Sequence, residues 1–102
     1  MSKRSKFELY GDILEAIRAD ISTNGSARLT RVQIKVNIPY DRFKAYIDNL
    51  SSSKLIDIAQ SENHDEIQIT SKGFEYLSQY EHVNNFLVAF GLADVPTKHN
   101  SK

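Results

Sequence analysis

Few side chains in this sequence could carry out covalent or metal chemistry. The chain has no cysteine and three histidines among its 102 residues, which excludes disulfides and thiolate metal sites. His64 lies beside Asp65 and Glu66, but one imidazole and two adjacent acids in a polar loop form a weak metal-binding pattern. Neither a glycine-rich phosphate loop nor a nucleophile elbow occurs. We therefore expect no metal site, no cofactor and no enzymatic activity, and the sequence identifies no small-molecule ligand.

Charged side chains are more informative, because they are unevenly distributed. The chain holds 13 Lys and Arg against 13 Asp and Glu, so its formal net charge is zero. Residues 1–54 carry ten basic and six acidic side chains, whereas residues 55–102 carry three and seven, which leaves +4 and −4. A neutral total argues against a polycation that coats nucleic acid. It does not exclude a local anionic partner for the first half.

The spacing of apolar residues predicts the elements that position these side chains. Apolar residues recur every three or four positions in residues 7–21, which predicts a helix over residues 5–23. Ser5 and Glu8 form a capping box at its start, and Asn24-Gly25 marks its end. The opposite, charged face of this helix is expected to face solvent.

Two more helices and a hairpin are expected in the rest of the chain. A helical stripe after Pro39 predicts a helix over residues 40–52. Two strands joined by a polar loop follow, at residues 55–59 and 67–69. Thr70 is expected to cap a last long helix over residues 71–90, which Gly91 ends.

Residues 29–37 give conflicting signals. The alternation of polar and β-branched residues after Thr30 favours a half-buried strand on propensity alone. The competing signs are a second capping box, formed by Thr30 with Gln33, and the helical spacing of Leu29, Val32 and Val36. The pattern alone leaves both interpretations open.

Four motifs occur together in the order helix, short segment, helix, hairpin, helix. They are Arg4-Ser5-Lys6 before Tyr10-x-x-Ile13-Leu14-x-x-Ile17, then Thr30-Arg31-Val32, then Tyr40-x-x-Phe43-x-x-Tyr46-Ile47-x-x-Leu50, then Thr70-x-Lys72-Gly73-x-x-x-Leu77. From Ser5 to about Phe90 the chain resembles the archaeal small winged-helix DNA-binding proteins, which include ten-a type chromatin proteins and predicted transcriptional regulators. The resemblance implies a winged helix-turn-helix and makes residues 30–37 a helix. Pro39 departs from it, because relatives often carry a Ser or Thr cap there.

The resemblance implies that residues 40–52 enter the major groove of double-stranded DNA. At 100° per residue, the face opposite Phe43, Ile47 and Leu50 is centred on Asp41, Ala45, Asp48 and Ser52. Because two of these four are acidic, strong nonspecific affinity is not expected. We expect base contacts from Tyr40 and Asn49, and phosphate contacts from Arg28, Arg31, Lys35, Arg42, Lys44, Arg4 and Lys6. The alternative is that these residues are ordinary solvated surface charges.

The loop between the two strands, at residues 61–66, has an acidic composition. Glu62, Asp65 and Glu66 are expected to keep it off phosphate. Asn63 and His64 are its remaining candidates for a DNA contact.

The last helix is expected to project beyond the core and to form a homodimer. Phe74 and Leu77 can pack inward, and a coiled-coil rhythm of four and three residues follows at Tyr76, Tyr80, Val83, Leu87 and Phe90. The alternative is intramolecular packing against the first helix. The resemblance implies an antiparallel coiled coil between two such helices.

The predicted fold is mainly α with a small β-hairpin. The expected divisions are a winged helix-turn-helix at residues 1–70, a dimerisation helix at 71–91 and a disordered tail at 92–102. No apolar stretch is long enough to span a membrane, so a cytoplasmic, nucleoid-associated location is expected. The predicted function is transcriptional regulation. The alternatives are an architectural chromatin protein and a winged helix that binds protein.

Overall fold

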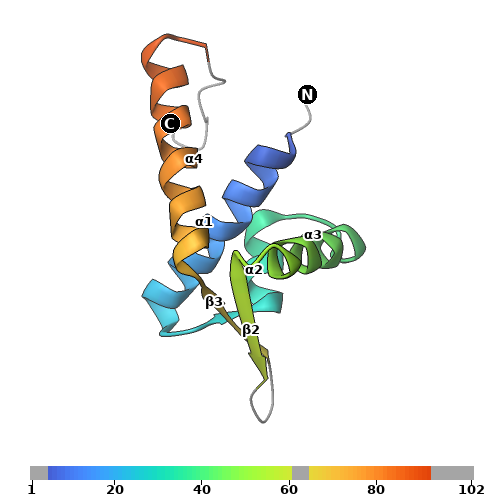
Figure 1. Cartoon of the computed structure of the whole chain (residues 1–102). Coiled ribbons are helices and arrows are strands. Elements are labelled where there is room, and N and C mark those ends of the chain that lie inside the picture. Colours follow the sequence, from blue (N-terminus) through green and yellow to red (C-terminus); the bar gives the residue numbers. More distant parts are fainter. Residues whose placement is uncertain (1–4, 61–64, 93–102) are drawn as a thin grey trace.

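The computed structural model describes residues 5–60 and 65–92. These residues form four helices and three strands (Figure 1), in the order α1 (Lys6–Asn24), β1 (Ala27–Arg28), α2 (Leu29–Val36), α3 (Tyr40–Ser52), β2 (Ile56–Gln60), β3 (Asp65–Ile69) and α4 (Ser71–Ala89). The mainly α architecture with a small antiparallel sheet agrees with the predicted fold class. Arg4, Asn63, His64 and the tail beyond Leu92 lie outside the described residues.

Helix α1 begins and ends where its capping signals predict. The Ser5 hydroxyl accepts a hydrogen bond from the Glu8 backbone at 3.1 Å, and the Glu8 carboxylate accepts one from the Ser5 backbone at 2.8 Å. Gly25 ends the helix with a φ of 84°, in the left-handed region that glycine adopts without strain. The predicted capping box and stop are confirmed.

Helix α2 is helical despite its β-branched sequence, as the resemblance implied. The capping box predicted from Thr30 and Gln33 is wrong. The helix starts one residue earlier, its cap residue Arg28 makes no side-chain cap bond, and the Gln33 amide donates to the Ile38 carbonyl at 2.7 Å. That last bond ties α2 to the turn before α3, so Gln33 stabilises the helix-turn-helix and not the helix start.

The sheet has one strand more than the predicted hairpin. Strands β2 and β3 pair antiparallel with Ile58 opposite Ile67, and the two-residue strand β1 pairs on the other edge of β3 with Ala27 opposite Ile67. A two-residue strand is too short to show the alternation by which strands are found in a sequence. Its pairing partner lies forty residues further along the chain.

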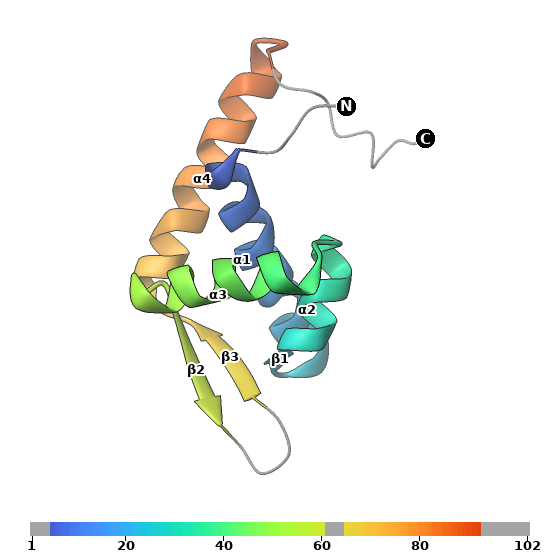
Figure 2. The ribbon, with the colours of Figure 1, turned by 90° about the vertical axis from the view of Figure 1, so that its right-hand side faces the viewer.

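Helix α3 occupies the residues predicted for it and packs one face inward. Pro39 is its cap residue and makes no side-chain cap bond, in agreement with the loss expected there. Phe43, Ile47 and Leu50 are buried, which confirms the predicted apolar stripe. Figure 2 shows α3 crossing one side of the helical part, with β2 and β3 extending away from it.

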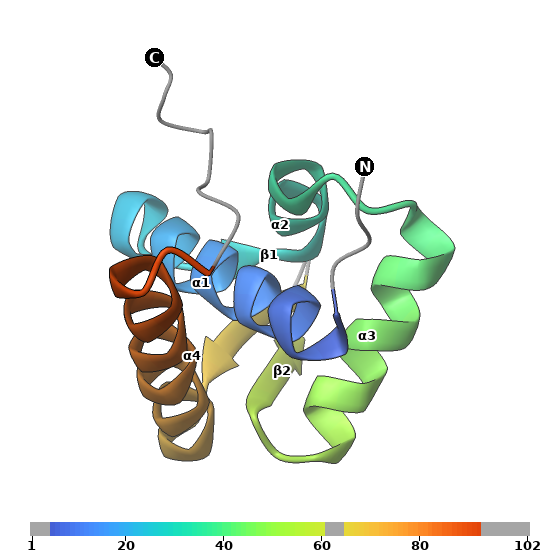
Figure 3. The same cartoon turned by 90° about the horizontal axis from the view of Figure 1, so that it is seen from above.

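The core surrounds α1. Seen from above, α1 runs between α4 and α3, with α2 behind it (Figure 3). Ile13, Leu14 and Ile17 are fully buried, and they share one apolar cluster with side chains from every other helix and from the sheet. Helix α1 therefore fixes the positions of α2, α3 and α4 relative to one another.

Helix α4 packs its first half against α1 and extends its second half beyond it. Thr70 caps the helix, since its hydroxyl accepts from the Gly73 backbone at 3.1 Å. Leu77 is buried as predicted, but Phe74 is 49% exposed, so its predicted inward position is wrong. A Cβ on Gly73 would overlap the Leu55 carbonyl oxygen, so this glycine lets α4 approach the chain before β2.

Helix α4 approaches α1 closely at Gly11. A Cβ there would overlap the aromatic ring of Tyr80, which is buried and donates a hydrogen bond to the Asp12 carboxylate at 2.5 Å. Burial first, and then this bond, raise the pKa of Tyr80, so the phenol remains the donor at neutral pH. The missing side chain at Gly11 and the bond to Asp12 together seat the ring on α1.

We predict that Gly11→Ala lowers the free energy of unfolding by about 1–3 kcal/mol, because the added methyl group overpacks the Tyr80 ring. Urea unfolding followed by circular dichroism measures the change. Ser78→Ala, at an exposed position of α4, is the control and should change stability by less than about 0.5 kcal/mol. A Gly11→Ala protein as stable as the wild type would contradict the packing described.

Candidate nucleic-acid interface

The outer face of α3 is exposed to solvent. Opposite the buried stripe, the side chains predicted to face outward are all exposed, namely Asp41, Ala45, Asp48 and Ser52. The flanking residues Tyr40, Arg42 and Asn49 are also exposed, and Lys44 is half-buried. Tyr40 is 55% exposed at the start of the helix, where a large aromatic side chain is available for contact.

The formal charges of the side chains on α3 cancel, with Arg42 and Lys44 against Asp41 and Asp48. The Lys44 ammonium lies 3.7 Å from the Asp48 carboxylate one turn later. Because the Lys44 side chain is half-exposed and that of Asp48 is exposed, this pair contributes little to stability. Arg42 forms no ion pair with any residue that the structure describes, and it is exposed. Arg42 is therefore a cation of α3 that is free to bind an anion.

Asn49 is anchored to α1. Its side-chain amide donates to the Tyr10 hydroxyl at 3.0 Å, and the Tyr10 ring packs edge-on against Tyr46 with centroids 5.7 Å apart. These contacts fix the second half of α3 relative to α1. Asn49 keeps one amide hydrogen and its carbonyl oxygen for another partner. Lys6 lies one turn before Tyr10 on the same side of α1 and is exposed.

Arg28 lies at the base of the sheet. It sits in β1 directly opposite Glu66 of β3, and its neighbour Ala27 is buried, so the Arg28 side chain projects from the opposite face of the sheet. The Arg28 Nε is buried and makes no hydrogen bond with a described residue. Arg28 therefore stands on the face of the sheet that points away from the core.

Asp20 connects α1, β1 and α2. It is 8% exposed, and its carboxylate accepts hydrogen bonds from the Arg28 backbone at 3.0 Å, the Arg31 Nε at 2.9 Å and the Asn24 amide at 2.5 Å. Burial acts to raise the pKa of Asp20, but these donors and the Arg31 charge outweigh it and hold the pKa below its usual value. Asp20 is therefore ionised and fully bonded at neutral pH.

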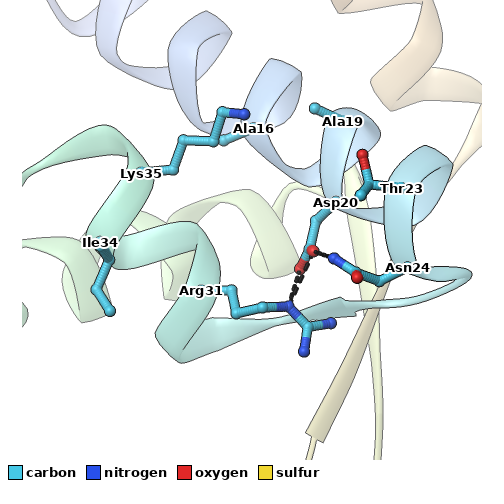
Figure 4. A pocket seen from close by; sticks show the side chains of 8 residues that line it. All are labelled: Ala16, Ala19, Asp20, Thr23, Asn24, Arg31, Ile34 and Lys35. Atoms are coloured by element: carbon cyan, nitrogen blue, oxygen red, sulfur yellow. Dashed lines mark hydrogen bonds and ion pairs between the residues drawn. The ribbon is translucent and has the colours of Figure 1, made fainter.

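Arg31 and Lys35 lie on a different flank of α2 from the one that faces α3. Gln33 bonds the turn before α3, whereas Lys35 lies about 200° further around the helix. Figure 4 shows Lys35 extending toward Ala16 of α1 and Arg31 bonded to Asp20. The structure therefore does not bring these two predicted DNA contacts to the outer face of α3, although they share the basic first half of the chain.

The predicted dimer residues divide into two groups. The Tyr76 hydroxyl donates to the Phe7 carbonyl at 2.9 Å, and Tyr80 is buried on Gly11. These two side chains pack against α1 within the same chain, which is the alternative to a dimer contact that the sequence left open. Val83 and Phe90 lie on the projecting half of α4 and are exposed, and Leu87 is half-buried.

The described residues contain neither a metal-binding cluster nor a membrane-spanning helix. Within residues 5–60 and 65–92, no group of three His, Cys, Asp or Glu side chains is placed to hold a metal ion. No helix in that part of the chain is long and apolar enough to cross a membrane.

Known proteins match this chain by family and by fold. A family model described as winged helix-turn-helix matches residues 3–87. No curated protein sequence matches. Eighteen solved chains match in structure. The three described below are each less than 25% identical to this chain.

Three of the similar structures are archaeal. Sso10a-2, described as a DNA-binding protein from Sulfolobus solfataricus, is 22% identical over 85% of each chain, with a TM-score of 0.71. The transcriptional regulator BldR from the same organism is 21% identical over 86% of this chain and 62% of its own, with a TM-score of 0.69. A protein from Archaeoglobus fulgidus is 18% identical over 76% of this chain and 86% of its own, with a TM-score of 0.68. At these identities the three structures establish a shared fold.

We predict that Asp20→Asn lowers the free energy of unfolding by about 2 kcal/mol at pH 7, because it removes the charge partner of Arg31 and weakens three hydrogen bonds. Because the pKa of Asp20 is lowered by folding, its contribution is complete above about pH 4 and is lost as the pH falls through the folded-state value. Urea unfolding at a series of pH values from 7 downward measures this, and the difference in stability between the two proteins should shrink as the pH falls.

The control is Asp48→Asn, which removes an exposed carboxylate one turn from Lys44. It should change stability by less than about 1 kcal/mol at each pH. If the two substitutions had equal effects at pH 7, the role assigned to Asp20 would be wrong.

Proposed function

The chain belongs to the winged helix-turn-helix family, and on that basis we propose that it is a DNA-binding transcriptional regulator that places α3 in the major groove. The observation that carries this proposal is the outer face of α3, which is exposed along its length and anchored to α1 by the bond from Asn49 to Tyr10. A rigid, exposed helix beside a hairpin is the arrangement that groove recognition requires.

The proposed contacts follow from the chemistry of each side chain. Tyr40 and the free amide groups of Asn49 are suited to base edges, and Arg42 and Lys44 to phosphates. Arg28 and Lys6 are proposed to contact the flanking backbone, and Arg4 belongs with them as a prediction from the sequence. Arg31 is assigned a positioning role through Asp20, because its Nε and one terminal nitrogen already donate within the chain.

The charge balance favours sequence selection over general coating of DNA. Asp41 and Asp48 stand on the same face as Arg42 and Lys44, so contacts made in the wrong register would bring a carboxylate close to phosphate. Two of the similar proteins are described as a DNA-binding protein and a transcriptional regulator, which supports the same role here. The proposed role is non-catalytic, at the nucleoid of the cytoplasm.

We also propose that two chains associate through the projecting half of α4. Large apolar side chains are exposed at the end of α4 and just after it, namely Val83, Phe86, Val88, Phe90 and Leu92. Soluble monomers rarely leave such a patch uncovered. The sequence predicted that the dimerisation segment begins at residue 71. We propose that it begins after Tyr80, because Leu77 and Tyr80 complete the core with α1 and only the residues beyond them are free to bind a partner. The resemblance implies an antiparallel pairing.

For DNA binding, the proposal predicts that Arg42→Ala weakens binding and makes the salt dependence shallower. The negative slope of log K against log salt should decrease in magnitude by about 0.9 for each Arg42 engaged. Fluorescence anisotropy over a salt series, with mixed-sequence duplexes and with duplexes enriched by selection, measures both quantities. Selection of one motif is the expected result. Arg18→Gln, which removes the same charge on the side of α1 that faces α4, is the control and should bind as the wild type does.

Each other outcome of that experiment has a defined meaning. Salt-dependent binding without sequence preference would replace the regulator with an architectural protein. No binding at low salt would end the DNA proposal and leave a winged helix that binds protein. An unchanged salt slope in Arg42→Ala would remove Arg42 from the interface.

For association, Phe90→Asp is predicted to convert a dimer to a monomer at micromolar concentration, because the new charge would be buried in the contact. Phe90 is 65% exposed within one chain, so the fold itself should tolerate the change. Sedimentation equilibrium measures the mass. Asn85→Asp adds the same charge at an exposed position of α4 and is the control. A monomeric wild-type protein at that concentration would overturn the proposed dimer.

A further inference from the structure

The end of α1 carries a chemically reactive dipeptide. Asn24 is the last residue of the helix and Gly25 follows it, and no other asparagine of the sequence stands directly before a glycine. Asparagine is a thermolabile residue, because the backbone nitrogen of the next residue can attack its side-chain amide. A glycine in that next position has no side chain to obstruct the attack and gives the backbone the freedom to make it. Asn24-Gly25 is therefore the pair in this chain best suited to deamidation.

Water reaches this pair. Asn24 and Gly25 are both exposed. Gly25 has a φ of 84°, and a Cβ built on it would meet no atom within 4 Å other than its chain neighbours. Helix ends also fray, so the last turn of α1 opens more readily than the turns before it. Neither burial nor steric cover therefore prevents a reaction at Asn24.

Two hydrogen bonds hold the pair in an unreactive geometry. The Gly25 backbone N–H donates to the Ile21 carbonyl at 2.8 Å, and the Asn24 side-chain amide donates to the Asp20 carboxylate at 2.5 Å (Figure 4). Because helical side chains point toward the start of their helix, the Asn24 Cγ is directed away from the Gly25 nitrogen. The last turn must open before the two atoms can meet. The rate of reaction is therefore set by the fraction of molecules in which that turn is open.

We propose that Asn24 is a site of spontaneous deamidation, and that the reaction releases the contact through which α1 holds β1 and α2. In the opened turn, hydroxide removes the proton from the Gly25 backbone nitrogen, which then bonds to the Asn24 Cγ. The bond from Cγ to Nδ2 breaks, and Nδ2 leaves as ammonia after taking a proton from water. Water then opens the resulting succinimide ring at one of its two carbonyls, which leaves aspartate or isoaspartate at position 24. Water and hydroxide are the only co-reactants, and nothing is oxidised or reduced.

The product cannot replace the asparagine at the junction. A carboxylate only accepts hydrogen bonds, so Asp20 loses one donor and gains a neighbouring negative charge. Its remaining donors are the Arg28 backbone and the Arg31 guanidinium, and the new carboxylate competes for both. Isoaspartate also lengthens the backbone by one methylene at the end of α1. The junction of α1, β1 and α2 therefore loosens in molecules that have reacted, and no spontaneous step restores the amide.

The site is tested by incubating the full chain in mildly alkaline buffer, with and without urea. Brief trypsin digestion after Arg18 and Arg28 releases residues 19–28, in which Asn24 is the only side-chain amide. Mass spectrometry follows the exchange of NH2 for OH in this peptide, and chromatography separates aspartate from isoaspartate. The expected result is progressive conversion of Asn24 in the folded protein, at least about tenfold more slowly than in urea, since the last turn must open.

An internal control comes from the same digest. Residues 36–42 form a second tryptic peptide, in which Asn37 is the only side-chain amide. Asn37 is exposed as Asn24 is, but the branched side chain of Ile38 follows it and obstructs the attack. Asn37 should therefore convert more slowly than Asn24 both in the folded protein and in urea.

The effect on the junction is tested with Asn24→Asp, which has the charge of the product. The readout is hydrogen exchange of the Arg28 backbone N–H, which donates to Asp20 at 3.0 Å. We expect this exchange to be at least about tenfold faster than in the matched variant Asn24→Ala, which loses the donor without adding a charge. The Gly73 N–H, bonded to Thr70 at the start of α4, should exchange at the same rate in both variants. Incubated wild-type protein gives the same readout without a substitution, should Asn24→Asp fail to fold.

Three results would overturn the proposal. Asn24 could remain intact in the folded protein while the urea sample converts completely, or Asn37 could convert ahead of it. Either result would remove the modification site. Equal exchange of the Arg28 N–H in Asn24→Asp and Asn24→Ala, or in incubated and fresh wild-type protein, would remove the release of the junction. None of these measurements contains DNA, so their results are independent of whether the chain binds it.

Discussion

The hydrogen-bonded carboxylate of Asp20 is the interaction on which the arrangement of the first three elements depends. Removing a carboxylate from water costs several kcal/mol unless its oxygens are bonded, so the donors of Arg28, Arg31 and Asn24 must all be in place. Those donors come from the end of α1, from β1 and from the first turn of α2, which fixes these elements together. Only three residues separate α2 from α3, so the direction of α2 also sets where α3 begins.

Helix α1 assigns successive positions to different neighbours. Tyr10 contacts α3, Gly11 receives the ring of Tyr80 from α4, and Asp20 holds α2. The buried face between these positions forms the centre of the core. The recognition surface and the projecting half of α4 are thus attached to one rigid helix. A partner bound to the recognition surface would therefore have a defined orientation relative to a partner bound to the projecting half of α4.

The proposed functions occupy separate surfaces because the charges and apolar groups are locally segregated. The outer face of α3 balances Arg42 and Lys44 against two aspartates, which suits selective contact with DNA. The far end of α4 is apolar and suits a second copy. The net charge of zero describes neither of these surfaces, because each depends on which side chains are neighbours.

The sequence by itself determined α1, α3, α4 and the hairpin of β2 and β3, because their signals are local. Helix α3 matches its predicted bounds, and the caps at Ser5 and Thr70 form as predicted, since each depends on residues within one helical turn. Residues 29–37 needed the family resemblance, because their β-branched pattern does not report the tertiary contacts that make them helical. Strand β1 was missed since its partner lies forty residues away.

Only the tertiary structure decided what the individual side chains do. Spacing alone assigned Tyr76 and Tyr80 to a partner chain. In the structure both pack on α1, Tyr76 through its bond to the Phe7 carbonyl and Tyr80 over Gly11, where the missing side chain leaves room for its ring. The sequence placed Arg31 and Lys35 beside DNA, whereas Asp20 and Ala16, both on α1, are their neighbours. The sequence did not predict the role of Asp20, since nothing local distinguishes it from a solvated acid. Local spacing specifies an element and its buried face, but the partner of a charged side chain is fixed only when the elements pack.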